Sequence, residues 1–325
     1  MIFNNISELI LYAEHNDISN IDIQLDTCTN DVLKNPILKK ISSLNIIDTD
    51  VTEIPKELIN ISRLDCQGTY ITMIPKELIN LHSLNCKFTY IKGIKKVECV
   101  KRVQKVKWIK GIPKEFINLR SLDCSRTQIT EIPKELVNLQ YLKCSKTYIK
   151  EIPKELINLQ YLKCGNTNIS WIPKELINLQ YLKCGNTNIS WIPKELINLQ
   201  YLKCSRTQIT KIPKELINLY TLDCSETQIT KIPISFINLR ILDCSYTQIT
   251  KIPKELVNIQ ELHCWDSKIK ELPVTLDLLE NIYDDIITLE EYKANVLRYK
   301  NEIKDIIKNS NILNNDVLNL ICSYI

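Results

Sequence analysis

The sequence predicts an α/β solenoid, in which short repeats stack and each repeat adds one strand to a parallel sheet. Residues 159–178 read LQYLKCGNTNISWIPKELIN, and residues 179–198 repeat this string without a change, so the period is 20 residues. A fixed period of about 20–50 residues is typical of repeat architectures. A unit this short cannot bury its own apolar side, so neighbouring units must stack around a shared core.

Cysteine recurs at the same interval of 20 residues, with a single interruption. The members of this series are Cys66, Cys86, Cys124, Cys144, Cys164, Cys184, Cys204, Cys224, Cys244 and Cys264. Neighbouring strands lie about 4.8 Å apart with parallel Cβ vectors, whereas a disulfide needs converging Cβ atoms about 3.8 Å apart. Free cysteine behaves as a small hydrophobe. We therefore predict that these thiols are buried and reduced.

Each unit fits L-x-x-L-x-C-x-x-T-x-I-x-x-I-P-x-x-L-x-N, and we number its positions 1–20 from the first leucine. Positions 4 and 6 alternate with positions 3, 5 and 7, which predicts a short strand with one buried and one exposed face. Threonine at position 9 can bond backbone groups where the chain leaves the strand. Isoleucines at positions 11 and 14 face inward. Proline at position 15 suits the start of one helical turn.

This pattern resembles the leucine-rich repeat, L-x-x-L-x-L-x-x-N/C-x-L, over residues 41–278. The resemblance implies a curved parallel sheet on the inner face and short helical turns on the convex face. We expect an N-terminal cap at 1–40, with a helix at 4–15 and a strand at 21–25. Residues 92–111 form one degenerate, basic unit. Residues 279–325 form a C-terminal helical cap, with a helix at 289–308 capped by Thr288 and a shorter one at 315–324.

Positions 3 and 5 of four successive units carry tyrosine and lysine on the inner face. The residues are Tyr141, Lys143, Tyr161, Lys163, Tyr181, Lys183, Tyr201 and Lys203. Stacked lysines repel one another, and tyrosine is enriched at binding faces. We predict that these residues bind a protein with an acidic surface. The alternative is that the ladder records duplication, with lysine stems lying along the tyrosine rings.

Charge and composition place nucleic acid second among the partners. The net charge is +4 and the pI is near 8.3, below the value of about 9 that marks nucleic-acid-binding domains. The basic stretch 92–111, with Trp108, and the column of position 5 lysines could contact phosphates. Units with aspartate at position 5, which we call aspartate rungs, flank this column. The chain lacks an apolar run long enough for a bilayer and a secretory signal. We expect a monomer in the cytoplasm.

The sequence does not predict an enzyme, a metal site or a cofactor. Of its three histidines, His263 could approach Asp243 and Ser245, but on an open sheet rather than in a water-excluding cleft. His263 and Cys264 point to opposite faces, so the two cannot hold one metal ion.

Two further resemblances concern function. The IPKELINL phrase resembles the short repeats of the Ras-group and bacterial effector leucine-rich repeat proteins. With its Ile, Asn and Lys bias, the whole chain resembles uncharacterised repeat proteins of amoebae and of the large DNA viruses that infect them, which implies an interaction scaffold, in the host cytoplasm if viral. The ending LNNDVLNLICSYI is similar to the first helix of an F-box, through Leu313, Asp316, Val317, Leu318, Ile321, Tyr324 and Ile325. It implies a substrate receptor that binds a Skp-type adaptor of a cullin ubiquitin ligase. The rival interpretation is a capping helix.

Overall fold

The computed structural model describes residues 1–19, 21–89, 111–276, 278–283 and 288–309, without the side chains of 304–309. The chain divides into two compact units, Met1–Ile209 and Thr210–Ile325. The first unit holds strands β1–β10, and the second holds β11–β14 and helix α3. Among the described residues, no helix has the length and apolar character needed to cross a membrane.

Within each compact unit the strands form a parallel sheet in which neighbours in space are neighbours in the chain. They are β1 (Ile2–Phe3), β2 (Asp22–Leu25), β3 (Ser43–Asn45), β4 (Arg63–Asp65), β5 (Ser83–Asn85), β6 (Ser121–Asp123), β7 (Tyr141–Lys143), β8 (Tyr161–Lys163), β9 (Tyr181–Lys183), β10 (Tyr201–Lys203), β11 (Thr221–Asp223), β12 (Ile241–Asp243), β13 (Glu261–His263) and β14 (Asn281–Tyr283). Pairing is parallel and joins equivalent positions of successive units, as in Leu162↔Leu182. The predicted repeat solenoid is confirmed.

Position 9 closes the turn that follows each strand. Thr167 Oγ1 donates a hydrogen bond of 2.6 Å to the carbonyl oxygen of Cys164, and the equivalent threonines of other units do the same, as sequence analysis predicted. Thr89 is an exception, because its buried hydroxyl has no partner among the described residues. The preceding residue, at position 8, has a positive φ even where it is not glycine, as at Arg126 (58°) and Lys146 (58°). Such a backbone costs about 1–2 kcal/mol for a non-glycine residue. The buried threonine bond therefore offsets part of the local strain in units such as those of Arg126 and Lys146.

The opposite side of each unit is one turn followed by an asparagine. The turn is closed by bonds such as Leu176 N–H to Pro173 O (3.3 Å). Asn178 Nδ2 then donates to the Ile157 carbonyl oxygen of the preceding unit at 2.9 Å. The equivalent asparagines repeat this bond along the chain. Successive units are thus tied together on this side as well as through the sheet.

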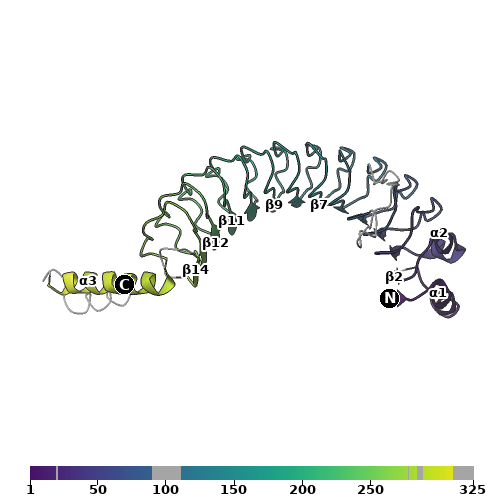
Figure 1. Ribbon diagram of the computed structural model, residues 1–325, viewed down its shortest axis with the longest axis horizontal. Coiled ribbons are helices and arrows are strands. Elements are labelled where there is room, and N and C mark those ends of the chain that lie inside the picture. The colour runs from purple at the N-terminus through teal and green to yellow at the C-terminus, as the bar shows by residue number, and fades with distance from the viewer. Residues whose placement is uncertain (20, 90–110, 277, 284–287, 310–325) are drawn as a thin grey trace, which may run out of the picture. The chain divides into compact units, whose positions relative to one another are not determined.

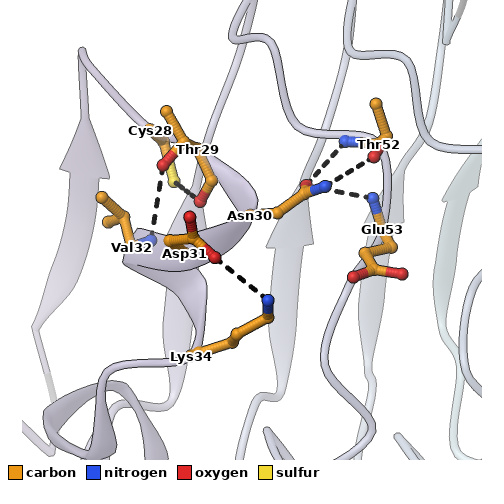
Figure 2. A network of polar contacts seen from close by, with 8 residues as sticks. All are labelled: Cys28, Thr29, Asn30, Asp31, Val32, Lys34, Thr52 and Glu53. Atoms are coloured by element: carbon orange, nitrogen blue, oxygen red, sulfur yellow. Dashed lines mark hydrogen bonds and ion pairs between the residues drawn. The ribbon is translucent and has the colours of Figure 1, made fainter.

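The N-terminal region adds its own strands and short helices (Figure 1). Helix α1 (Ile6–Ala13) is capped by Asn5, and β1 pairs with β2. The helix α2 (Asn30–Leu33) and the 3-10 helix Pro36–Lys40 follow; these two and β1 were not predicted. Figure 2 shows how α2 is joined to the first repeat. Asn30 Nδ2 donates to Thr52 Oγ1 (2.6 Å), and Thr52 N–H donates back to Asn30 Oδ1 (2.9 Å).

The C-terminal region begins with one more strand than the repeats predict. Strand β14 pairs with β13, through Ile282 and Leu262, before helix α3 (Leu289–Asn309). The predicted cap at Thr288 is confirmed, because Glu291 N–H donates to Thr288 Oγ1 at 3.1 Å and Thr288 N–H donates to Glu291 Oε2 at 3.1 Å. Buried Tyr292 anchors the helix through a 3.1 Å bond from its hydroxyl to the Pro273 carbonyl oxygen.

Candidate functional site

The candidate site is the Tyr/Lys stripe, which we define as the tyrosines and lysines at positions 3 and 5 of β7–β10. All eight residues lie in the first compact unit. The parallel register places Tyr161 beside Tyr181 and Lys163 beside Lys183. Figure 1 labels β7 and β9, and the turn that carries β8 lies between them. The structure therefore brings the predicted residues together as two adjacent columns on one sheet face.

The tyrosine column is a stack of rings that opens at one end. The ring centroids of Tyr141 and Tyr161 lie 4.0 Å apart, and those of Tyr161 and Tyr181 lie 4.3 Å apart, with interplanar angles of 13° and 12°. Tyr201 is tilted by 30° at 5.9 Å from Tyr181, and 37 % of it is exposed. The first three tyrosines cover one another's faces and are half-buried. Burial, and then the hydrogen bond with Tyr141, raises the pKa of Tyr161, so its hydroxyl stays neutral.

The lysine column lies against these rings. Lys143 Nζ is 5.1 Å from the Tyr141 ring centroid, and Lys163 Nζ is 5.4 Å and 5.6 Å from those of Tyr161 and Tyr181. These are cation–π distances. Burial, and then the positive charges of Lys143 and Lys183, lower the pKa of Lys163. The stripe therefore carries crowded positive charge, which an anionic group would relieve.

Aspartate and asparagine occupy position 5 in the neighbouring units, and there the side chain has a structural role. Asp123 Oδ1 accepts the N–H of Ser125 at 3.0 Å, and Asp243 Oδ1 accepts that of Ser245 at 3.0 Å. Asn45, Asp65, Asn85 and Asp223 accept the equivalent N–H of position 7. A lysine ammonium cannot accept a hydrogen bond, so β7–β10 forgo this contact. Sequence reasoning missed this replacement of a hydrogen-bond acceptor by lysine, although the recurrence of Asp and Asn at position 5 is visible in the sequence.

The stripe begins beside an acidic rung. Lys143 Nζ lies 3.9 Å from Asp123 Oδ2, so the first lysine is partly neutralised within the chain. Lys163 is half-buried, and Lys183 is exposed. Lys203 is half-buried, like Lys163, so the positive charge available to a partner comes from Lys163, Lys183 and Lys203.

At position 5 of the unit of β13, the exposed sheet face carries His263 in place of lysine or aspartate. His263 Nε2 lies 2.6 Å from Glu261 Oε1, and its ring stacks on Tyr283 with centroids 4.2 Å apart. Asp243 makes its own turn bond with Ser245. The residues weighed as a dyad thus have other partners. In the described part of the chain, no group of three or more His, Cys, Asp or Glu residues could hold a metal ion.

The cysteines of position 6 are buried and free. Burial raises the pKa of the Cys164 thiol to about 12. A thiol with so high a pKa carries almost no thiolate at neutral pH and is a poor nucleophile. The predicted structural role of this ladder as core packing is confirmed.

Position 19 forms an apolar column that sequence reasoning did not single out. Its members are 42–53 % exposed: Ile59, Ile79, Ile117, Val137, Ile157, Ile177, Ile197, Ile217, Ile237 and Val257. The signal was two adjacent apolar residues at positions 18 and 19, of which only one can face inward.

Two other predicted regions lie outside the described residues: the basic stretch 92–111, apart from Gly111, and the F-box-like segment 313–325.

Comparison with known proteins identifies the repeat class to which the fold corresponds. Residues 118–139 match the family model for the Leucine Rich Repeat. A search of curated proteins finds no match. A leucine-rich repeat protein of Leptospira interrogans is similar in structure, with a TM-score of 0.71 and 22 % identity over 89 % of this chain and 82 % of that one. The fold is that of the leucine-rich repeat proteins.

Two other solved structures share the fold. The functional domain of InlJ from Listeria monocytogenes, which includes a cysteine ladder, has a TM-score of 0.65 and 19 % identity over 81 % of this chain. The plant peptide hormone receptor RGFR1, in complex with RGF2, has a TM-score of 0.60 and 21 % identity over 83 % of this chain. This chain spans 62 % and 48 % of their respective lengths. Likenesses at this level of identity establish the fold alone.

Proposed function

We propose that this protein is a non-catalytic scaffold whose Tyr/Lys stripe binds an acidic segment of a protein partner. The observation that carries the proposal is the exchange at position 5. Six described rungs use Asp or Asn there to accept a backbone N–H of the following turn. The four rungs of the stripe give up that acceptor and place a lysine instead. Duplication accounts for copies of such a rung, but it does not account for the first loss of a stabilising bond.

The stripe has the chemistry for carboxylates. Lys163 and Lys183 offer ammonium groups on adjacent rungs, and strands are spaced about 4.8 Å apart, so one partner segment can reach both. The stacked tyrosine rings lie within cation–π distance of the ammonium groups, and tyrosine side chains lose little entropy on binding. At the open end, Tyr201 offers more of its ring to an apolar neighbour in the segment. An acidic segment with an apolar residue at one end fits this surface.

Binding of a labelled Asp/Glu-rich peptide to the full chain tests the proposal by fluorescence anisotropy. The double substitution Lys163→Gln with Lys183→Gln should abolish saturable binding. Lys174→Gln with Lys194→Gln is the matched control, because it removes two exposed lysines from position 16 of the same two units. Equal loss in both variants, or undiminished binding in the first, would contradict a site on the stripe.

The same assay separates protein from nucleic acid. We expect a labelled single-stranded oligonucleotide to bind the chain less tightly than the acidic peptide, and with a steeper dependence on salt. The roles of 92–111 in nucleic-acid binding and of 313–325 in adaptor binding stay predictions. The cytoplasmic location and the monomeric state also stay predictions.

A further inference from the structure

A second surface of the first compact unit carries a ligand-sized groove that the Tyr/Lys stripe does not use. The groove has a volume of about 930 Å³ and is lined by positions 13–17 of successive units, from Ile112 to Trp191. Two tryptophans at its end are unusually open to solvent. Trp171 is 42 % exposed, and Trp191, one unit further on, is 48 % exposed. Tryptophan is enriched at binding hot spots, so this pair singles out the groove.

The fold does not require tryptophan at position 13. Glu131 and Glu151 occupy that position in the two preceding units, which have the same strand and turn. The tryptophans do change their surroundings, because Pro173 is buried, whereas Pro153 in the preceding unit is only half-buried. In the units with tryptophan, the proline at position 15 is buried, while much of each indole stays exposed to solvent.

Position 13 therefore reads as a column of two carboxylates followed by two indoles. Each indole carries one N–H donor on a side chain that is 42 % exposed at Trp171 and 48 % exposed at Trp191. Lys134 and Lys154, at position 16, also line the groove. At positions 16 and 17, lysines and glutamates alternate along the groove, so their charges largely cancel, whereas Glu131 and Glu151 at position 13 have no lysine in their own column of the groove lining.

We propose that this groove binds an extended proline-rich segment of a partner protein, with basic side chains at one end. A polyproline II segment has no internal hydrogen bonds, so its carbonyl groups are free to accept the indole N–H groups. It is stiff, loses little entropy on binding and packs well on aromatic rings. Prolines lie on Trp171 and Trp191, and the basic residues pair with Glu131 and Glu151. This surface is separate from the stripe, so the chain holds two different segments.

Tryptophan fluorescence of the full chain, titrated with a synthetic peptide that has two arginines followed by a proline-rich stretch, tests the proposal. We expect a saturable change in the wild-type protein. The double substitution Trp171→Glu with Trp191→Glu should weaken binding about thirtyfold, the loss typical of a hot-spot tryptophan, measured with a labelled peptide because the fluorophores are removed. Glutamate is compatible with the fold at this position, since Glu131 and Glu151 already occupy it.

Three controls decide the outcome. Trp265→Ala removes a tryptophan of similar exposure, 41 %, from position 7 of another unit and should leave binding unchanged. A peptide with the prolines replaced by alanine should bind much more weakly. Lys163→Gln with Lys183→Gln should bind the proline-rich peptide as the wild type does, so failure of the stripe and failure of the groove are distinguishable. Unchanged binding by the Trp171→Glu and Trp191→Glu variant, or equal binding of the alanine peptide, would overturn the proposal.

Discussion

The aspartate rungs and the lysine rungs share one scaffold and differ at its exposed face. In the units of β6 and β8 the leucine of position 4 and the cysteine of position 6 are equally buried. Between them, Asp123 accepts a bond from its own turn, whereas Lys163 lies over tyrosine rings and beside other lysines. The difference shows that a repeat protein can change the exposed side of a few rungs without changing its core. Those units lose the stabilising hydrogen bond to the side chain at position 5 and gain a positively charged surface.

The largest expected effect is the loss of stability on substitution of a buried leucine, and it should be equal in aspartate and lysine rungs. Leu162 and Leu222, at position 4 of a lysine rung and an aspartate rung, are both fully buried. Substitution of either by alanine should lower the free energy of unfolding by about 2–5 kcal/mol, because the core loses a large side chain and retains a cavity. Urea unfolding measures both variants. A much smaller loss for Leu162→Ala would show that the lysine rungs also differ in their cores.

Conversion of an aspartate rung into a lysine rung should have a smaller effect. Asp223 Oδ1 accepts bonds from both the N–H (3.2 Å) and the hydroxyl (2.7 Å) of Ser225. We expect Asp223→Lys to destabilise the protein by about 1 kcal/mol, because these bonds to a charged acceptor are lost at a half-buried site. The control is Glu226→Lys, an equal change of charge at position 8 of the same unit. Equal effects of the two substitutions would contradict a structural role for position 5.

The smallest effect is a difference in pH dependence. The folded-state pKa of Lys163 lies below its ordinary value, so the unfolded chain binds more protons as the pH approaches the ordinary lysine pKa from below. Stability should therefore rise with pH in that window. Near and above the ordinary tyrosine pKa of 10.0, in a range that overlaps the lysine window, the raised pKa of Tyr161 acts in the opposite direction, because the folded chain keeps a proton that the unfolded chain loses. Urea unfolding at successive pH values should show a weaker rise in Lys163→Met; an identical rise would exclude Lys163 as its source.

The period and residue alternation were sufficient to predict the strands, their register and the burial of residues such as Leu162 and Cys164. The helix at 289–308 was also legible, because Thr288 and Glu291 form a capping pair. Sequence alone did not predict the bond from Asp123 to the N–H of Ser125. That bond depends on the turn made at position 8, where Arg126 has a positive φ without being glycine. The exposure of Trp171 depends equally on how the turns of neighbouring units stack.

The stripe itself could be predicted as a set of residues, but its internal contacts could not. Position 3 places Tyr161 and Tyr181 on one face. Whether their rings stack or splay depends on side-chain rotamers and on the twist between strands. The stack at 4.3 Å, and its opening at Tyr201, are properties of the folded sheet. They decide which atoms a partner can reach.

The most direct test of this account measures binding and stability in one variant. Lys163→Asp with Lys183→Asp restores an acceptor for the position 7 N–H and places carboxylates beside Lys143 and Lys203. We predict that binding of the Asp/Glu-rich peptide is lost, while the free energy of unfolding stays equal to that of the wild type or rises by about 0.5–1 kcal/mol. Retained binding, or a loss of stability as large as that expected for Asp223→Lys, would contradict the exchange of a structural contact for a binding surface.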